Sequence, residues 1–220
     1  MKEKLKAVGY CYLLFLSIGF ILMALIKSID NFYVVSNLGL PSILERDALV
    51  RLKEYVNGNK TYAIFLSALF VPLIEEVIFR LWLSLKPNHI AISISVIVVS
   101  LVFRLRDLFS FNWQSVFIVI TAASIYSMVF MFLRSKDTSS YIRKNIPTVL
   151  LGSISAIFFG LIHIGNFAPL NGDIWFLYPI YIVPQIILGY FAVYLRIKHG
   201  FFYALLFHAL INFIAIYPKL

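Results

Sequence analysis

The residues 69–80 read Leu69-Phe70-Val71-Pro72-Leu73-Ile74-Glu75-Glu76-Val77-Ile78-Phe79-Arg80, so two adjacent acids and an arginine stand inside an apolar run. A charged side chain near the centre of a bilayer costs about 2.5–3.5 kcal/mol on insertion scales. Such charges persist where partners inside a helix bundle stabilise them. Glu76 and Arg80 are four residues apart, so in a helix they share a face and can pair. Glu75 then points about 100° away around the helix and can face another group.

The composition of the whole chain agrees with a membrane setting. Hydrophobic residues make up 61% of the 220 residues and charged residues only 13%. A soluble domain carries about one-quarter charged residues because it needs a solvated exterior. These values exclude an ordinary soluble globule and indicate that lipid covers much of the surface.

The net charge of +9 has two possible origins, nucleic-acid binding or membrane topology. The basic residues are scattered in short groups between apolar runs, which favours loops facing anionic headgroups. We therefore expect lipid bilayer as a partner and no nucleic acid. The single cysteine, Cys11, excludes an intrachain disulfide and a cysteine-rich zinc site.

The apolar runs predict an all-α fold, a polytopic transmembrane bundle of about seven spans, with six to eight as the range, because a spanning helix needs about 20 apolar residues. The candidate spans are 8–26, 61–85, 89–103, 113–133, 146–164, 175–195 and 200–217.

The first candidate span follows Lys2, Lys4 and Lys6, and the residues after it contain no small-residue cleavage site. We interpret it as a retained anchor rather than a signal peptide. Apolar residues at helical spacing in 42–57 predict an amphipathic helix on the membrane surface, or a loop helix packed on the bundle. Residues 1–60 would form an N-terminal region and 61–220 the core.

Basic residues are concentrated in 134–144 and are absent from 165–174. Because cytoplasmic loops carry an excess of Lys and Arg, this contrast favours an N-terminus inside. We predict an integral protein of a bacterial cytoplasmic membrane.

Two histidines, His163 and His208, lie within apolar stretches, and Asn212 follows His208 by one helical turn. Alone, each histidine is explained by hydrogen-bonded helix packing. Together with the intramembrane carboxylates, the two histidines indicate a catalytic site. Glu75, His163 and His208 match the two histidines and one glutamate that hold a catalytic zinc with an open position for water.

The same groups without a metal provide a carboxylate base, with histidines that orient or polarise water. Asn212 has an amide that can stabilise an oxyanion. A purely structural alternative is a buried Glu76–Arg80 clamp between helices, with Glu75 lining a polar seam. A clamp, however, requires only one acid.

Three motifs, Glu75-Glu76-x-x-x-Arg80, Phe159-x-x-x-His163 and His208-x-x-x-Asn212, occur in this order, each in an apolar helix. The chain thereby resembles the CAAX protease and bacteriocin-processing family of intramembrane proteases, also called CPBP or Abi. The flanking Pro72, Gly160 and Gly189 agree with this resemblance, which covers roughly residues 70–213.

The resemblance implies a site built from catalytic and supporting residues, namely Glu75, Glu76, His163, His208 and Asn212, supported by Arg80 and Phe159. Glu75 would activate the attacking water with help from His163. His208 and Asn212 would stabilise the oxyanion, and Glu76 with Arg80 would hold the first motif in shape. The resemblance leaves two alternatives open, a site that uses zinc and a site without a metal.

The resemblance also implies a function, hydrolysis of a peptide bond in a membrane-associated peptide or protein. Family members act on prenylated C-termini, on leader or pheromone peptides, or in bacteriocin self-immunity. One departure is the long stretch between the first and second motifs, which we interpret as an inserted helical pair around 89–133.

Two other functions remain possible from the sequence. A non-catalytic binding, regulatory or bacteriocin-immunity protein would keep the same motifs and sequester a partner. A small proton-coupled transporter would also place Glu and His inside a membrane. The sequence shows no obvious internal repeat, which counts against a transporter.

Overall fold

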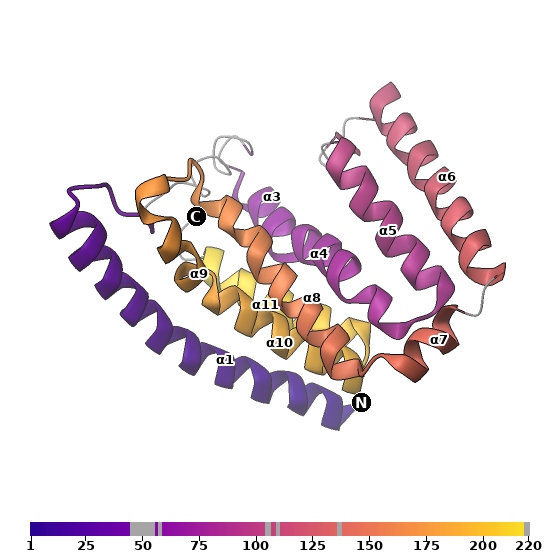
Figure 1. Cartoon of the computed structure of the whole chain (residues 1–220), viewed down its shortest axis with the longest axis horizontal. Helices are drawn as coiled ribbons and strands as arrows, with labels where there is room; N and C mark the ends of the chain where they lie inside the picture. The colour runs from indigo at the N-terminus through magenta and orange to yellow at the C-terminus, as the bar shows by residue number, and fades with distance from the viewer. Residues whose placement is uncertain (45–55, 57–58, 104–106, 109–110, 136–137, 218–220) are drawn as a thin grey trace. The chain divides into compact units, whose positions relative to one another are not determined.

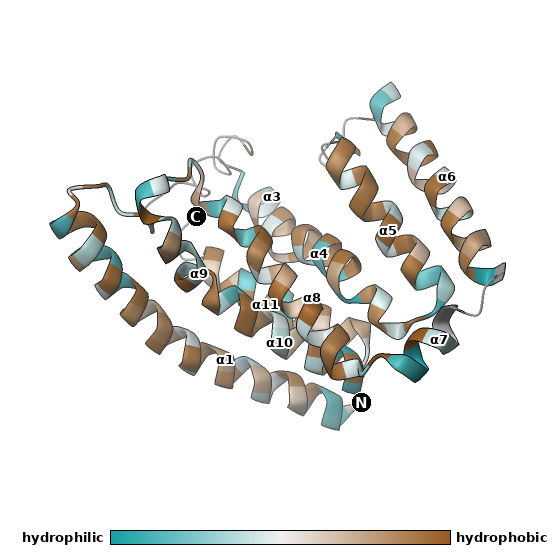
Figure 2. Ribbon diagram, in the orientation of Figure 1, coloured by the Kyte–Doolittle hydropathy of each residue, from teal (hydrophilic) through white to brown (hydrophobic). Residues whose placement is uncertain are grey.

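The computed structural model describes residues 1–44, 56, 59–103, 107–108, 111–135 and 138–217, and each regular element among them is a helix (Figure 1). Five helical segments are long and apolar enough to cross a membrane: Lys2–Asn37, Lys60–Phe79, Trp113–Arg134, Thr148–Phe167 and Gly172–Lys198. Two shorter apolar helices, Pro87–Val102 and Phe201–Ile216, complete the series. These segments follow the order of the predicted spans and confirm an all-α polytopic protein. Figure 2 shows hydrophobic residues along most of their lengths.

Several boundaries differ from the predicted ones for local reasons. The first helix, α1 (Lys2–Ile29), continues as a π-helical segment to Asn37. The predicted span 175–195 is divided into a 3₁₀ segment (Gly172–Leu177), α9 (Tyr178–Tyr181) and α10 (Val183–Lys198). Both α9 and α10 carry a proline in their first turn, where the missing N–H is tolerated.

Contacts divide the chain into two compact units, Met1–Pro72 with Ile154–Leu220, and Leu73–Ser153. In the first unit, α1 packs against α10 and against α11 (Phe201–Ile216), and α10 packs against α11. Another π-helical segment, Phe65–Phe70, follows α3 (Lys60–Ile64) and also packs against α11. This unit therefore contains the helix of His208 together with the helices around it.

Two glycines set the contact between α8 (Thr148–Ile162) and α10 in the first unit. A Cβ at Gly189 would lie 2.9 Å from the Cα of Ala156, and a Cβ at Gly160 would lie 3.2 Å from the backbone nitrogen of Ile186. A side chain at Gly189 would collide with the Ala156 backbone, and a Cβ at Gly160 would overlap the Cγ1 atom of Ile186, so that the Ile186 side chain would have to move. Small residues that let backbones approach closely are the usual means of packing helices in membranes.

A buried carboxylate ties three distant parts of the first unit together. Asp30, at the end of α1, is fully buried and accepts hydrogen bonds from the Ser42 hydroxyl and the Ile43 N–H. The Tyr181 hydroxyl of α9 also donates to Asp30, at 2.6 Å. A buried charge is costly unless it is hydrogen-bonded, and here three donors surround it. The predicted amphipathic helix at 42–57 lies almost wholly outside the described residues.

The second unit contains the rest of α4 (Val71–Phe79), then α5 (Pro87–Val102), α6 (Trp113–Ser135) and α7 (Thr138–Asn145). Helices α5 and α6 pack against each other along their lengths. They are the helices that we interpret from the sequence as an inserted pair. The structure shows their pairing, and their status as an insertion stays a prediction.

Candidate active site

The first motif lies on α4 in the second unit and contains a buried ion pair. The Nη1 atom of Arg80 is 3.1 Å from the Oε1 atom of Glu76, and both side chains are fully buried. The guanidinium also lies over the Phe79 ring, 5.6 Å from its centroid. Glu75 is half-buried. The structure thus pairs Glu76 with Arg80, as their spacing predicts.

A hydrogen bond from α5 supports the same helix. The buried Ser93 hydroxyl donates to the backbone carbonyl of Val77, at 2.7 Å, and also contacts the carbonyl of His89 on its own helix. Val77 directly follows Glu76, so this bond holds the backbone of the first motif. Sequence reasoning did not identify Ser93, because a serine in an apolar helix gives no indication of its partner.

The second and third motifs meet in the first unit at the Phe159 ring. Phe159 and His208 are buried, and their rings pack edge to face with centroids 5.4 Å apart. The ring centroids of Phe159 and His163 are 4.6 Å apart. Both predicted imidazoles therefore pack against the ring of Phe159.

The tautomer of His163 follows from its backbone contact. The Nδ1 atom of His163 is 2.7 Å from the carbonyl oxygen of Phe159. A carbonyl can only accept, so Nδ1 carries the hydrogen, and in the neutral ring Nε2 has the lone pair. A lone pair on Nε2 is what a proton acceptor or a metal ligand requires.

Asn212 has a structural contact that the sequence did not suggest. Its Nδ2 atom donates to the backbone carbonyl of Ser67, at 3.0 Å. Ser67 lies in the π-helical segment, where the Val71 N–H bonds to the carbonyl of Leu66, five residues back. In this register the donor for Ser67 would be residue 72, which is a proline without an N–H. The Asn212 amide takes the place of that missing donor.

The structure therefore brings the predicted residues together in two groups. Glu75, Glu76 and Arg80 belong to the second unit, and the first unit contains Phe159, His163, His208 and Asn212. The other two histidines have contacts elsewhere. His89 contacts the Ser84 hydroxyl through Nδ1, at 2.7 Å, and the ring of His199 packs against those of Tyr194 and Tyr203.

The predicted metal ligands are Glu75, His163 and His208. Within either unit, the described residues contain no group of three His, Cys, Asp or Glu side chains that could hold a metal ion. The possible zinc ligands come from both units, Glu75 from one and His163 with His208 from the other. We therefore derive no step through a metal, and zinc stays a prediction.

Part of the chain matches a known protein family. Residues 57–142 match the model described as type II CAAX prenyl endopeptidase Rce1-like. The matched stretch contains the first motif and runs through α5 and α6, and it ends before the second and third motifs. Comparisons with curated proteins and with solved structures find no match. The family match confirms the resemblance indicated by the motifs, to the CAAX protease and bacteriocin-processing family of membrane proteases.

Proposed function

We propose that the protein is an intramembrane endopeptidase that hydrolyses a peptide bond of a membrane-associated peptide or protein. The observation that carries this proposal is the match to a protease family over the stretch containing Glu75, Glu76 and Arg80. The buried pairing of Glu76 with Arg80 supports different roles for the two adjacent acids. Glu76 neutralises a buried cation, and Glu75 is the acid assigned to the chemistry.

In the proposed reaction, the Glu75 carboxylate accepts a proton from a water molecule as the water oxygen bonds to the peptide carbonyl carbon. The carbonyl electron pair moves onto oxygen and forms a tetrahedral oxyanion. His208 and the second N–H of the Asn212 amide donate hydrogen bonds to that oxygen. The carbon–nitrogen bond then breaks, and the proton held by Glu75 passes to the leaving amine.

His163 assists in this reaction through its Nε2 atom. The bond from Nδ1 to the Phe159 carbonyl fixes the tautomer, so Nε2 accepts a hydrogen bond from the attacking water and orients it. The rings of His163 and His208 both pack against the Phe159 ring, which supports a shared site for the two imidazoles. If zinc is used, Glu75, His163 and His208 would hold it, and it would lower the pKa of bound water.

The substrate can be sought by comparing peptide ends in membranes of cells that express the wild type, Glu75→Gln or Glu3→Gln. Glu3 is an exposed acid at the start of α1 and gives a matched change outside the motifs. We expect new termini with the wild type and with Glu3→Gln, and their loss with Glu75→Gln at equal protein levels. The same termini in all three samples would contradict a peptidase that depends on Glu75.

A further inference from the structure

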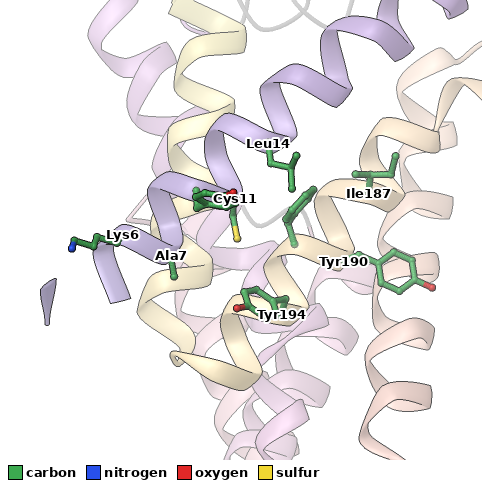
Figure 3. A pocket seen from close by; sticks show the side chains of 9 residues that line it. Lys6, Ala7, Cys11, Leu14, Ile187, Tyr190 and Tyr194 are labelled. Atoms are coloured by element: carbon green, nitrogen blue, oxygen red, sulfur yellow. The ribbon is translucent and has the colours of Figure 1, made fainter. Parts of the chain in front are cut away.

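An apolar groove runs between α1 and α10 in the first unit, and the described residues that line it include none of the motif residues. It has a volume of about 640 Å³. Figure 3 shows side chains from both helices around it. Its lining is mostly apolar or aromatic, and among the described residues that line it Lys6 alone is charged. The lining residues from α1 are Lys6, Ala7, Tyr10, Cys11 and Leu14, and those from α10 are Ile187, Tyr190, Phe191 and Tyr194.

An aromatic cluster of Phe15, Phe191 and Phe207 packs behind the groove floor. Phe191 packs against Phe15 and Phe207, with ring centroids 6.2 and 6.0 Å away. Phe15 and Phe207 also pack edge to face with each other. This aromatic cluster fixes the groove floor. Leu14 and Tyr190, by contrast, are 44% and 43% exposed at the rim, so the groove is open along its side.

The length of the groove suits one leaflet. The lining residues of α1 extend from Lys6 to Leu14, which at 1.5 Å per residue is about 12 Å. The hydrocarbon of one leaflet is about 15 Å thick, half of the bilayer core. An acyl chain lying along the groove would therefore run from the headgroup level at Lys6 into the apolar interior.

Basic residues are concentrated at the Lys6 end. Lys4 lies over the Tyr203 ring at the start of α11, 5.6 Å from its centroid, and Arg196 at the end of α10 lies over the Phe201 ring. These contacts bring the start of α1 beside the junction of α10 and α11. The charged residues on these helix ends are Lys2, Glu3, Lys4, Lys6, Arg196 and Lys198, so a single acid accompanies the bases.

We propose that this groove binds an anionic phospholipid, with its phosphate at Lys6 and an acyl chain along the face formed by Tyr10, Leu14 and Tyr190. The apolar lining and its length fit the chain, and the basic helix ends complement the charge of the headgroup. A zwitterionic lipid has the same chains without the net charge. The groove therefore selects by headgroup, and it does so independently of the proposed peptidase activity.

The direct test is native mass spectrometry of the purified full-length protein with phosphatidylglycerol or phosphatidylcholine of identical chains. We expect the wild type to bind phosphatidylglycerol roughly tenfold more tightly than phosphatidylcholine. Lys6→Gln should weaken the binding of phosphatidylglycerol by roughly fivefold. Lys27→Gln makes the same change on the same helix at its other end, and it should change nothing. Equal binding of the two lipids, or equal effects of both substitutions, would overturn the proposal.

A second pair of variants tests the apolar part of the groove. Ala7→Phe fills the groove with an aromatic ring and should weaken the binding of both lipids to the same extent. Gly9→Phe adds the same ring on the same helix where a Cβ meets no atom within 4 Å, and it should leave binding unchanged. Unchanged binding of both lipids by Ala7→Phe would place the lipid elsewhere.

Discussion

At the residue scale, the Glu76–Arg80 pair matters because both side chains are fully buried. Removing one partner of a buried ion pair leaves an uncompensated charge, whereas removing both does not. The pair therefore stabilises the first motif only while both residues are present. Its spacing was readable from the sequence, but its complete burial was not, because burial depends on neighbouring helices.

We expect Glu76→Gln to lower the free energy of unfolding by about 3–5 kcal/mol, because it removes the carboxylate that pairs with the buried Arg80 guanidinium. The double variant Glu76→Gln with Arg80→Met should recover part of that loss. Thermal unfolding of the purified variants in detergent measures both effects. Additive losses in the double variant would show that the two side chains do not stabilise each other.

His163 allows its two ring nitrogens to be tested separately. In His163→Asn, the amide can still donate to the Phe159 carbonyl, as Nδ1 does, but no group remains at the place of Nε2. We expect this variant to fold with near wild-type stability and to lose cleavage by at least about 100-fold. Unfolding and cleavage are measured on the same preparation. Full cleavage by His163→Asn would remove Nε2 from the proposed mechanism.

At the element scale, the close contact of α8 with α10 depends on glycine. Gly189→Ala places a Cβ 2.9 Å from the Ala156 backbone, and overpacking of this kind costs about 1–3 kcal/mol. Gly9→Ala is the matched control, because its Cβ meets nothing within 4 Å and alanine favours a helix. We expect a lower melting temperature for Gly189→Ala and an unchanged or higher one for Gly9→Ala. Equal melting temperatures would contradict the close packing.

The π-helical segment gives a second element-scale prediction, on Asn212 and Pro72. Asn212→Ala removes the donor to the Ser67 carbonyl and should cost about 1–3 kcal/mol. In a Pro72→Ala background, residue 72 regains an N–H that can serve Ser67, so the same substitution should cost less. A double-mutant cycle in detergent measures this coupling. Zero coupling would show that the asparagine does not compensate for the proline.

The helices could be predicted from the sequence, but the hydrogen bonds that join distant helices could not. Hydropathy and charge identified the spans, and the order of the motifs indicated a resemblance that the match over residues 57–142 supports. The Asp30 cluster was not predicted, because its partner Tyr181 is 151 residues away along the chain. The contact of Asn212 with Ser67 was missed for the same reason. Local patterns cannot reveal partners that only the tertiary fold brings together.

At the scale of the whole molecule, we propose two properties, peptide cleavage that depends on Glu75 and lipid binding in the groove between α1 and α10. The described residues that line the groove include none of the predicted catalytic residues, so lipid binding and peptide cleavage can be examined separately. Substitutions in the groove should leave Glu75-dependent cleavage measurable. Loss of one property therefore does not imply loss of the other.

The most direct test of the central claim is cleavage by purified protein in liposomes, in water enriched in ¹⁸O. The reporter is a membrane-anchored peptide identified from the new termini. The account predicts ¹⁸O in the new carboxyl terminus with the wild type and with Glu3→Gln, and a loss of rate of at least about 100-fold in Glu75→Gln. Undiminished cleavage in both Glu75→Gln and His163→Ala would contradict it.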